Sequence, residues 1–438
     1  MTPSLGIRQN RPPRKPNALV PRRAYFSTQC RTTRLSQKPP STGGGYIGPT
    51  ILLTLIQVMV SWAVFAPPVL AKQALPDMGL DPAWIGMLPV ILFTAATFSS
   101  MMSAGLVSRF NPMRASQILV LLCAVGSACI ATSNLWLVVL GSALIGVGLG
   151  PATPASSHIL SRVTPRHLQP FVFSIKQTGV PLGGVLAGFV GPPLTLIWNW
   201  QVAILVVSAG CLAVAIITEI WSRNYARFAD PSVQIRFELI GPLRLLLRSP
   251  VIRWMLGGCV PLVIAQYALT TFIVLYLQED IGLSVITAGA VLAVAQASGG
   301  TGRIIFGAIA SRWATPLFTL LMLALLASVA AFLTSSLTSS WPLAAIYGVG
   351  VLFGAGAAGW NGVYLAEAAR RAPGGEVSRT TGAIGFVIFA AVVIGPAVFG
   401  GIVATVSYEV AYAGIGVLML VSVFSFLRAM KLIQAETS

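Results

Sequence analysis

The sequence predicts an all-α membrane protein with twelve transmembrane helices in two six-helix, pseudo-symmetric halves. Of its 438 residues, 55% are hydrophobic and 9% are charged, and the mean hydropathy is +0.82. A soluble protein with so few charges would expose an apolar surface and aggregate. Continuous apolar stretches of about 20 residues recur, and each can cross roughly 30 Å of hydrocarbon as a helix that satisfies its own backbone hydrogen bonds.

Residues 1–45 differ from the rest of the chain. They carry nine Lys and Arg and no acid, and they lack the apolar core of a secretory signal. The composition is typical of a disordered basic tail. An organellar transit peptide or a start codon assigned too far upstream would look the same, so all three interpretations stay open.

From Tyr46 onward the apolar stretches predict twelve spans. They lie near 47–71, 83–107, 113–133, 135–159, 170–192, 198–219, 251–277, 284–310, 314–335, 341–367, 378–403 and 408–428. The longest interruption, 220–250, would be a cytoplasmic central loop. It separates an N-terminal six-helix bundle, 46–219, from a C-terminal one, 251–430.

The distribution of basic residues predicts the orientation. With the N-terminus cytoplasmic, only Lys72 lies in an outer loop, and the inner loops carry sixteen basic residues: Arg109, Arg114, Arg162, Arg166, Arg223, Arg227, Arg236, Arg244, Arg248, Arg253, Arg312, Arg370, Arg371, Arg379, Arg428 and Lys431. This bias follows the positive-inside rule. We therefore expect both termini in the cytoplasm, in a bacterial inner membrane, or in an organellar membrane if the tail is a transit peptide.

Several functional classes are disfavoured. The formal charge of +17 resides in the tail and loops, which argues against nucleic-acid binding. The five cysteines form no pair or Cys/His cluster, so we expect neither a metal nor a cofactor. No P-loop or hydrolase motif is present, so neither an ATP drive nor an enzyme is predicted.

The two halves repeat one another. The second span ends with Gly105, Ser108 and Arg109, and the eighth ends with Gly307, Ser311 and Arg312, so a glycine three or four residues before a Ser-Arg pair recurs. Small residues and a proline also recur in the fifth and eleventh spans, where they would allow close helix packing: Gly179, Pro181, Gly183, Gly184, Gly395, Pro396, Gly400 and Gly401. Paired six-helix halves are typical of secondary transporters.

On these motifs the chain resembles the major facilitator superfamily over residues 46–430. The loop after the second span is similar to that family's G-x-x-x-D-R-x-G-R-R signature, with Ser108 at the Asp position and Asn111 at the second Gly. A serine could still cap a helix, without the charge. The run 174–184 and Trp360-Asn361-Gly362 are similar to the branch of cyanate and nitrate porters. The resemblance implies a gate at the two Gly…Ser-Arg loops.

Two basic residues lie at membrane depth, where a charge is costly and indicates function. Lys176 would lie about 10 Å from the inner end of its span. It would face a central cavity and an anionic solute, snorkel to the interface, or bond neighbouring helices. Arg303 would serve either the solute and gate, or a structural contact with a gate residue such as Glu367. No Asp or Glu lies at mid-membrane depth, which weakens proton symport unless His158 or Glu367 carries the proton.

The resemblance implies that polar and aromatic residues on the first, fourth, seventh and tenth spans line a central cavity, and Gln177 lies beside Lys176 on the fifth. Some of these residues would only join helices. The candidates are Gln57, Trp62, Thr153, Ser156, Ser157, His158, Gln177, Gln266, Tyr267, Trp360, Asn361 and Tyr364. The predicted function is alternating-access transport of a small, anionic solute by a monomer, coupled to H+ or a counter-anion. The alternatives are an exporter of drugs or amphipathic compounds and a non-transporting receptor or scaffold.

Overall fold

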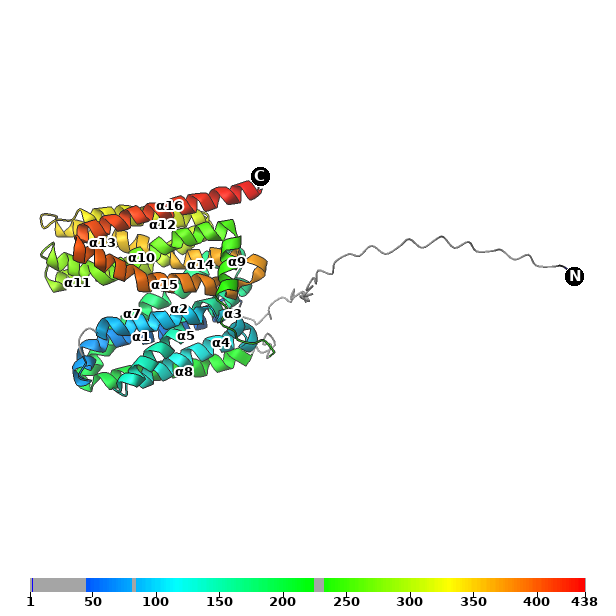
Figure 1. Cartoon of the computed structure of the whole chain (residues 1–438), viewed down its shortest axis with the longest axis horizontal. Coiled ribbons are helices and arrows are strands. Elements are labelled where there is room, and N and C mark those ends of the chain that lie inside the picture. The colour runs from blue at the N-terminus through cyan, green and yellow to red at the C-terminus, as the bar shows by residue number, and fades with distance from the viewer. Residues whose placement is uncertain (1, 3–44, 81–83, 224–231, 438) are drawn as a thin grey trace, which may run out of the picture. The chain divides into compact units, whose positions relative to one another are not determined.

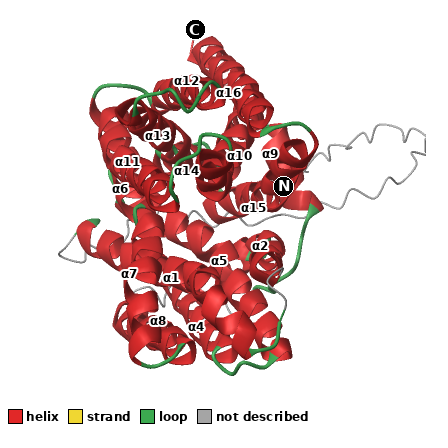
Figure 2. Ribbon diagram, turned by 90° about the vertical axis from the view of Figure 1, so that its left-hand side faces the viewer, coloured by secondary structure: helices red, strands yellow, loops and turns green. Residues whose placement is uncertain are grey.

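The computed structural model describes residues 2, 45–80, 84–223 and 232–437 (Figure 1). The predictions for the basic tail and for residues 224–231 of the central loop therefore lie outside the described residues. The compact unit Ser41–Ser438 contains both predicted halves, and all that follows concerns this unit. Its described residues fold as helices and connecting loops, as the all-α prediction requires (Figure 2).

The described residues of the first half form eight α-helices. They are α1 (Ile47–Asp77), α2 (Trp84–Ser100), α3 (Ser103–Phe110), α4 (Pro112–Ile130), α5 (Leu135–Val163), α6 (Gln169–Gln177), α7 (Gly179–Ile197) and α8 (Trp200–Ser222). Helices α2 and α3 meet at a bend of 64°, and α6 continues into α7 across Thr178. These eight helices therefore make six spans.

The second half begins after α9 (Ile240–Arg248), a short helix in the central loop. It contains α10 (Pro250–Glu279), α11 (Val285–Arg312), α12 (Pro316–Ser335), α13 (Leu343–Ala358), α14 (Asn361–Arg370), α15 (Val377–Thr405) and α16 (Tyr408–Thr437). Since α13 and α14 form one broken span, this half also has six. Among the described residues, eleven helical spans pass the length and hydropathy requirement, and the bent α2–α3 pair is the twelfth.

The sequence marks helix starts by a polar cap followed by proline. Asn111 before Pro112, Ser249 before Pro250 and Thr315 before Pro316 each accept a hydrogen bond from an amide of the first turn. Proline fits that first position because its missing N–H has no helical partner there. These caps set where α4, α10 and α12 begin.

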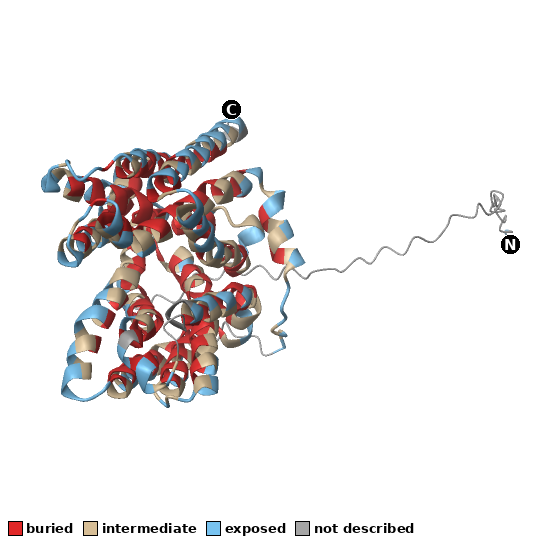
Figure 3. Ribbon diagram, turned by 60° about the vertical axis from the view of Figure 1, so that its left-hand side comes forward, coloured by how far each residue is buried: buried red, intermediate tan, exposed pale blue. Residues whose placement is uncertain are grey.

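Buried residues gather where helices lie against one another, and exposed residues lie on the outward faces (Figure 3). Many of the exposed residues are large and apolar. Leu196 and Ile286, for example, are 87% and 82% exposed. Such exposure would be costly in water but suits contact with lipid tails. The chain is therefore a multi-pass membrane protein.

Candidate functional site

A cavity of about 910 Å³, partly open to solvent, lies between the two halves. Its polar lining residues are Gln57, Ser61, Thr153, Gln177, Gln266, Tyr267, Arg303, Trp360, Asn361 and Thr381. The rest of the lining is mostly apolar and includes Val64, Phe65, Phe93, Ile388, Phe389 and Val392. Of the described residues that line this cavity, only Arg303 carries a charge.

Lys176 lies directly behind this lining instead of in it. Its side chain, in a residue that is 3% exposed, donates from Nζ to Gln57 Oε1 at 2.6 Å and to Gln177 Oε1 at 3.1 Å. Thr153 Oγ1 is 3.5 Å away. The prediction that Lys176 itself faces the cavity is therefore corrected, because the two glutamines stand between its ammonium and the open space.

Arg303 is also 3% exposed, and it reaches the cavity lining from α11. Its Nε donates to the Ala358 carbonyl at 2.9 Å, and its Nη1 donates to the Gln177 carbonyl of the other half at 2.6 Å. The suggested contact with Glu367 is wrong, because that carboxylate binds Arg370 and Arg371 at the end of its own helix. Arg303 therefore joins the two halves at the cavity.

The second half contributes a linked set of polar and aromatic residues. Asn361 Nδ2 donates to Gln266 Oε1 at 3.3 Å, which connects α14 to α10. Trp360 lines the cavity while its Nε1 donates to the Ala357 carbonyl at 2.9 Å. Tyr267, next to Gln266, packs edge-on against Phe93 of the first half, with ring centroids 6.0 Å apart.

Five predicted cavity residues lie outside the lining: Trp62, Ser156, Ser157, His158 and Tyr364. Ser156 and Ser157 are buried, and Ser156 Oγ donates to carbonyls of its own helix. Trp62 is 7% exposed and packs near Gly210, and Tyr364 is fully buried against Trp360. His158 Nδ1 is hydrogen-bonded to Ser378 Oγ of the second half at 3.0 Å. Helical rotation explains these differences, since residues one or two positions apart on a helix point to different faces.

Sequence reasoning missed the phenylalanines of the lining, which come from three helices. Phe65 lies on α1, Phe93 on α2 and Phe389 on α15. The Phe93 and Phe389 rings are 6.2 Å apart, across the two halves. No sequence signal distinguishes these phenylalanines from lipid-facing ones, because an apolar span has no polar face to set its rotation.

The two Gly…Ser-Arg loops lie at the same end of the helices, which we call the basic end (Arg109, Arg162, Arg312, Arg371). There Ser311 Oγ accepts a hydrogen bond from the Phe171 amide in the first turn of α6, at 3.0 Å. Ser311 thus caps a helix of the other half. Ser108 is exposed, and Asn111 caps α4 instead, by accepting from Met113 and Arg114 amides. The suggestion that serine takes over as a cap therefore holds only for Ser311.

Close packing at the basic end joins the halves through small residues. A Cβ on Gly307 would lie 2.5 Å from Ser174 Oγ, and a Cβ on Gly362 would lie 2.2 Å from Ser174 Cα. On the other side of the interface, a Cβ on Gly382 would lie 2.6 Å from the Ser100 carbonyl oxygen at the α2–α3 bend. The halves are therefore in direct contact at this end.

The remaining predicted gate residues surround that contact. The central loop passes over Gly105, where an added Cβ would lie 3.1 Å from Ile235 Cα. Arg109 and Arg312 are exposed. Glu367 is 1% exposed and its Oε1 lies 2.5 Å from Arg371 Nε, so a buried carboxylate with two guanidiniums ends α14.

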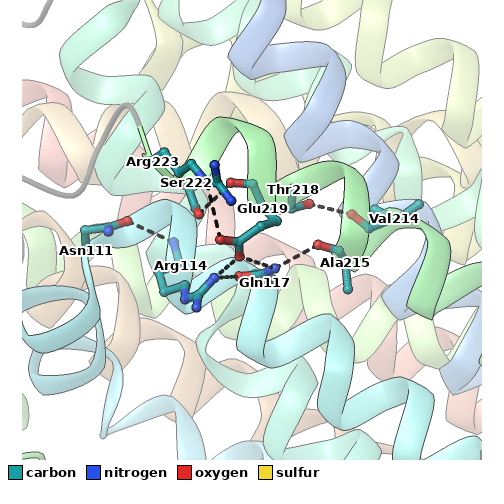
Figure 4. A network of polar contacts seen from close by, with 9 residues as sticks. All are labelled: Asn111, Arg114, Gln117, Val214, Ala215, Thr218, Glu219, Ser222 and Arg223. Carbon is teal, nitrogen blue, oxygen red and sulfur yellow. Dashed lines mark hydrogen bonds and ion pairs between the residues drawn. The ribbon is translucent and has the colours of Figure 1, made fainter.

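A second polar network at the basic end lies within the first half (Figure 4). Arg114 on α4 forms an ion pair with Glu219 on α8. Gln117 donates from Nε2 to both Glu219 Oε2 and the Ala215 carbonyl, at 3.0 and 2.9 Å. This network ties two helices of one half and lies outside the cavity lining, so we assign it to packing.

The predicted packing glycines divide into two groups. A Cβ on Gly179 or Gly183 would lie 2.8 Å from Gln57 Cβ or 2.5 Å from Ser61 Cβ, so α7 approaches α1 closely there. On α15, a Cβ on Gly395 or Gly400 would only make tight or ordinary contact with α10, next to Pro396 inside the helix. Gly184 is in ordinary contact and Gly401 has open space, and Pro181 lies in the first turn of α7.

Comparison with known proteins agrees with this architecture. The sequence profile of the Major Facilitator Superfamily matches residues 51–389. No curated protein matches the sequence. A solved structure of the fucose:proton symporter FucP in the outward conformation is similar, with a TM-score of 0.70 at 17% identity, over 88% of this chain and 98% of that one. An E. coli FucP variant gives a TM-score of 0.68 at the same identity and coverage.

The human organic anion transporter MFSD10 (TETRAN) has a TM-score of 0.66 at 14% identity, over 86% of this chain and 98% of that one. At such identities these likenesses show the fold alone. The profile match spans most of the chain, and the fold has two six-span halves around a central cavity. The chain belongs to the major facilitator superfamily.

Proposed function

We propose that this protein is a secondary transporter that carries a small anionic solute across a membrane by alternating access. One observation carries the anionic part of the proposal. Arg303 and Lys176 are two buried cations at one cavity, and among the described residues no carboxylate lies within ion-pair distance of either. Elsewhere, as at Glu367, this fold does pair a buried charge.

Burying an ion without a counter-charge is unfavourable, and hydrogen bonds to neutral oxygens offset only part of that cost. An anionic solute in the cavity would supply the missing charge. A cationic solute would be repelled by both side chains. The site therefore favours anions over neutral molecules, and neutral molecules over cations.

The contacts between the halves support the alternating-access part. The tightest of them lie at the basic end, where Ser311 and Ser174 meet the opposite half, and Arg303 and Tyr267 add contacts at the cavity. If the basic end is cytoplasmic, as the charge distribution predicts, the cavity would open outward in this state. Rocking the halves to separate the basic end would then release solute to the other side. A bacterial inner membrane and a monomeric unit remain part of this proposal.

The coupling ion is either H+ or a counter-anion. Within the described lining of the cavity no carboxylate is present, which favours anion exchange. His158 at the interface with Ser378 and buried Glu367 are the candidates for a proton-coupled route. Uptake into proteoliposomes with an imposed pH gradient, compared with uptake into liposomes preloaded with the same anion, separates the two.

Matched carboxylate and amide ligands test the anionic solute. Purified full-length protein is screened by thermal shift with nitrate, acetate, benzoate and phenylacetate, and with acetamide, benzamide and phenylacetamide. We expect at least one anion to stabilise the protein and no amide to match it. Arg303→Gln should weaken that binding by roughly 30-fold, since a charge-assisted hydrogen bond is worth about 2 kcal/mol.

Arg248→Gln is the matched control, because Arg248 is exposed on α9. It should leave the stabilisation unchanged. Equal stabilisation by an acid and its amide, or equal losses in the two variants, would contradict the proposal. The stabilising anion is then the substrate for uptake into proteoliposomes, where flux separates a transporter from a receptor or scaffold.

The exporter alternative has one observation in its favour, the aromatic lining formed by Phe65, Phe93 and Phe389. Such a lining also suits amphipathic compounds. An exporter would be stabilised by neutral and cationic amphiphiles as strongly as by anions. The same screen, extended to a quaternary ammonium compound, decides between them.

A further inference from the structure

Lys176 fixes the orientation of two amide side chains at the cavity. An ammonium group only donates hydrogen bonds, so both Gln57 and Gln177 must turn their amide oxygens toward its Nζ. Their NH2 groups then point away from Lys176. Gln57 Nε2 donates to Ser61 Oγ at 3.1 Å, while the NH2 of Gln177 stays available at the lining.

Arg303 adds further donors beside Gln177. A guanidinium has five N–H groups, and Arg303 uses Nε and Nη1 for the carbonyls of Ala358 and Gln177. Gln266 Oε1 accepts from Asn361, so another amide oxygen of the lining is already engaged. We call Gln177, Gln266, Arg303 and Asn361 the donor cluster, because most of the polar groups that they leave for a ligand are N–H donors.

A group that only accepts hydrogen bonds fits the donor cluster best. A carboxylate is such a group, and a guanidinium matches its two oxygens with parallel N–H bonds. Arg303 is the one cationic residue of the described lining, and a single cation fits one negative charge. Lys176 reaches the solute only through the amides that it orients.

Apolar side chains line the other part of the cavity and suit an apolar part of a ligand. Phe65, Phe93 and Phe389 line it and are only partly buried, so an apolar group placed against them would remove ring surface from water. Residues of both halves line this cavity, so a ligand with a body larger than a nitrate or cyanate ion can contact the polar and the apolar parts of the lining together.

We infer that the cavity takes a monocarboxylate with an apolar, ring-sized body, held at its carboxylate by the donor cluster, and that Lys176 is the positioning residue that makes the cluster donate. This inference rests on the proposed anion transport and names its substrate class. The apolar body packs against Phe65, Phe93 and Phe389 while the carboxylate faces Arg303.

A series of monocarboxylic acids of increasing size tests the substrate class. Thermal-shift titrations of the full-length protein compare acetate, butyrate, benzoate, phenylacetate and the dianion phthalate, each against its amide, with nitrate as the inorganic probe. We expect phenylacetate or benzoate to bind at least about tenfold more tightly than acetate, because filling an apolar pocket contributes about that much. Phthalate should bind more weakly than benzoate.

The failures of the two proposals are distinguishable. If acetate or nitrate binds as tightly as the aromatic acids, or if only they bind, the inferred class is wrong and anion transport stands. If the amides bind as tightly as their acids, anion transport is wrong as well. If none of the monocarboxylates in the series binds, the inferred class is overturned.

The role of Lys176 is tested by selectivity. In Lys176→Met the two glutamines are free to turn, so the ratio of benzoate to benzamide affinity should fall at least about tenfold. Lys176→Arg keeps a donor-only cation and should retain most of that ratio. A loss of affinity for both ligands with an unchanged ratio would mean that Lys176 is only structural. Lys431→Met, which removes an exposed lysine on α16 far along the chain from the cavity residues, is the matched control and should leave the ratio unchanged.

Discussion

The contact of Ser174 with Gly307 and Gly362 predicts how the conformational equilibrium can be shifted. In Gly362→Ala the new Cβ would lie 2.2 Å from Ser174 Cα and 2.5 Å from its amide nitrogen, where ordinary contact begins at 3.4 Å. Backbone atoms cannot rotate away, so α14 and α6 must separate by about 1 Å. Overpacking of this kind costs about 1–3 kcal/mol.

That cost falls only on the state in which the basic end is closed. The ratio of closed to open molecules should therefore drop about 5- to 150-fold. Spin labels on His167 and Trp313, both exposed at the basic end, report the separation of the halves by pulsed electron spin resonance in a cysteine-free background. Gly362→Ala should move the distance distribution to longer values.

Two comparisons make the test specific. Gly348→Ala is the matched control, since a Cβ there has no atom within 4 Å. Gly307→Ala should act like Gly362→Ala, but its nearest atoms are the Ser174 side chain, so Ser174→Gly should partly reverse it and should not reverse Gly362→Ala. Unchanged distances in Gly362→Ala, or equal reversal of both variants, would refute the reasoning.

Three other substitutions test the basic end. Ser311→Ala removes the cap on α6 and should favour the open state by about 1 kcal/mol in the same spin-label measurement, whereas Ser311→Asp, which adds a negative charge at a helix N-terminus, should favour the closed state. Glu367→Gln leaves two guanidiniums without their counter-charge and should destabilise the protein by about 1–3 kcal/mol, measured by thermal melting. Glu376→Gln, at an exposed residue, is the control. Equal melting temperatures of the two variants would contradict the pairing. Asn111→Ala should melt lower than Asn111→Gly by about 1 kcal/mol, because both lose the cap but only alanine is strained at a φ of +65°, and equal melting would remove that explanation.

The number and type of spans could be predicted because each depends on local composition. A span needs about 20 apolar residues, and the caps at Asn111, Ser249 and Thr315 mark its start. The bends were harder to predict. The 64° turn between α2 and α3 falls at residues 101–102, where the sequence has no proline or glycine. Gly382 of the other half packs closely against the Ser100 carbonyl at this turn, a contact that the local sequence does not indicate.

The site could be predicted only in part, because rotation about a helix axis is set by packing. Gln57, Gln177, Gln266 and Asn361 could be proposed since polar side chains avoid lipid. Whether such a residue lines the cavity or supports it from behind, as Lys176 does, depends on atoms from another helix. No such signal marks Phe65, Phe93 and Phe389, because phenylalanine side chains are also stable in contact with lipid.

The repeated Gly…Ser-Arg loops show why internal similarity does not guarantee equivalent contacts. Ser311 reaches the first turn of α6 directly, but Ser108 is exposed and the central loop covers Gly105 in its place. In that same loop, Glu238 Oε2 lies 3.0 Å from Nη2 of Arg379, in the first turn of α15. At one side of the basic end, a serine of one half caps a helix of the other half. At the other side, the central loop that connects the two halves makes the contact. Since this loop belongs to neither copy of the repeat, the sequence repeat alone could not predict the asymmetry.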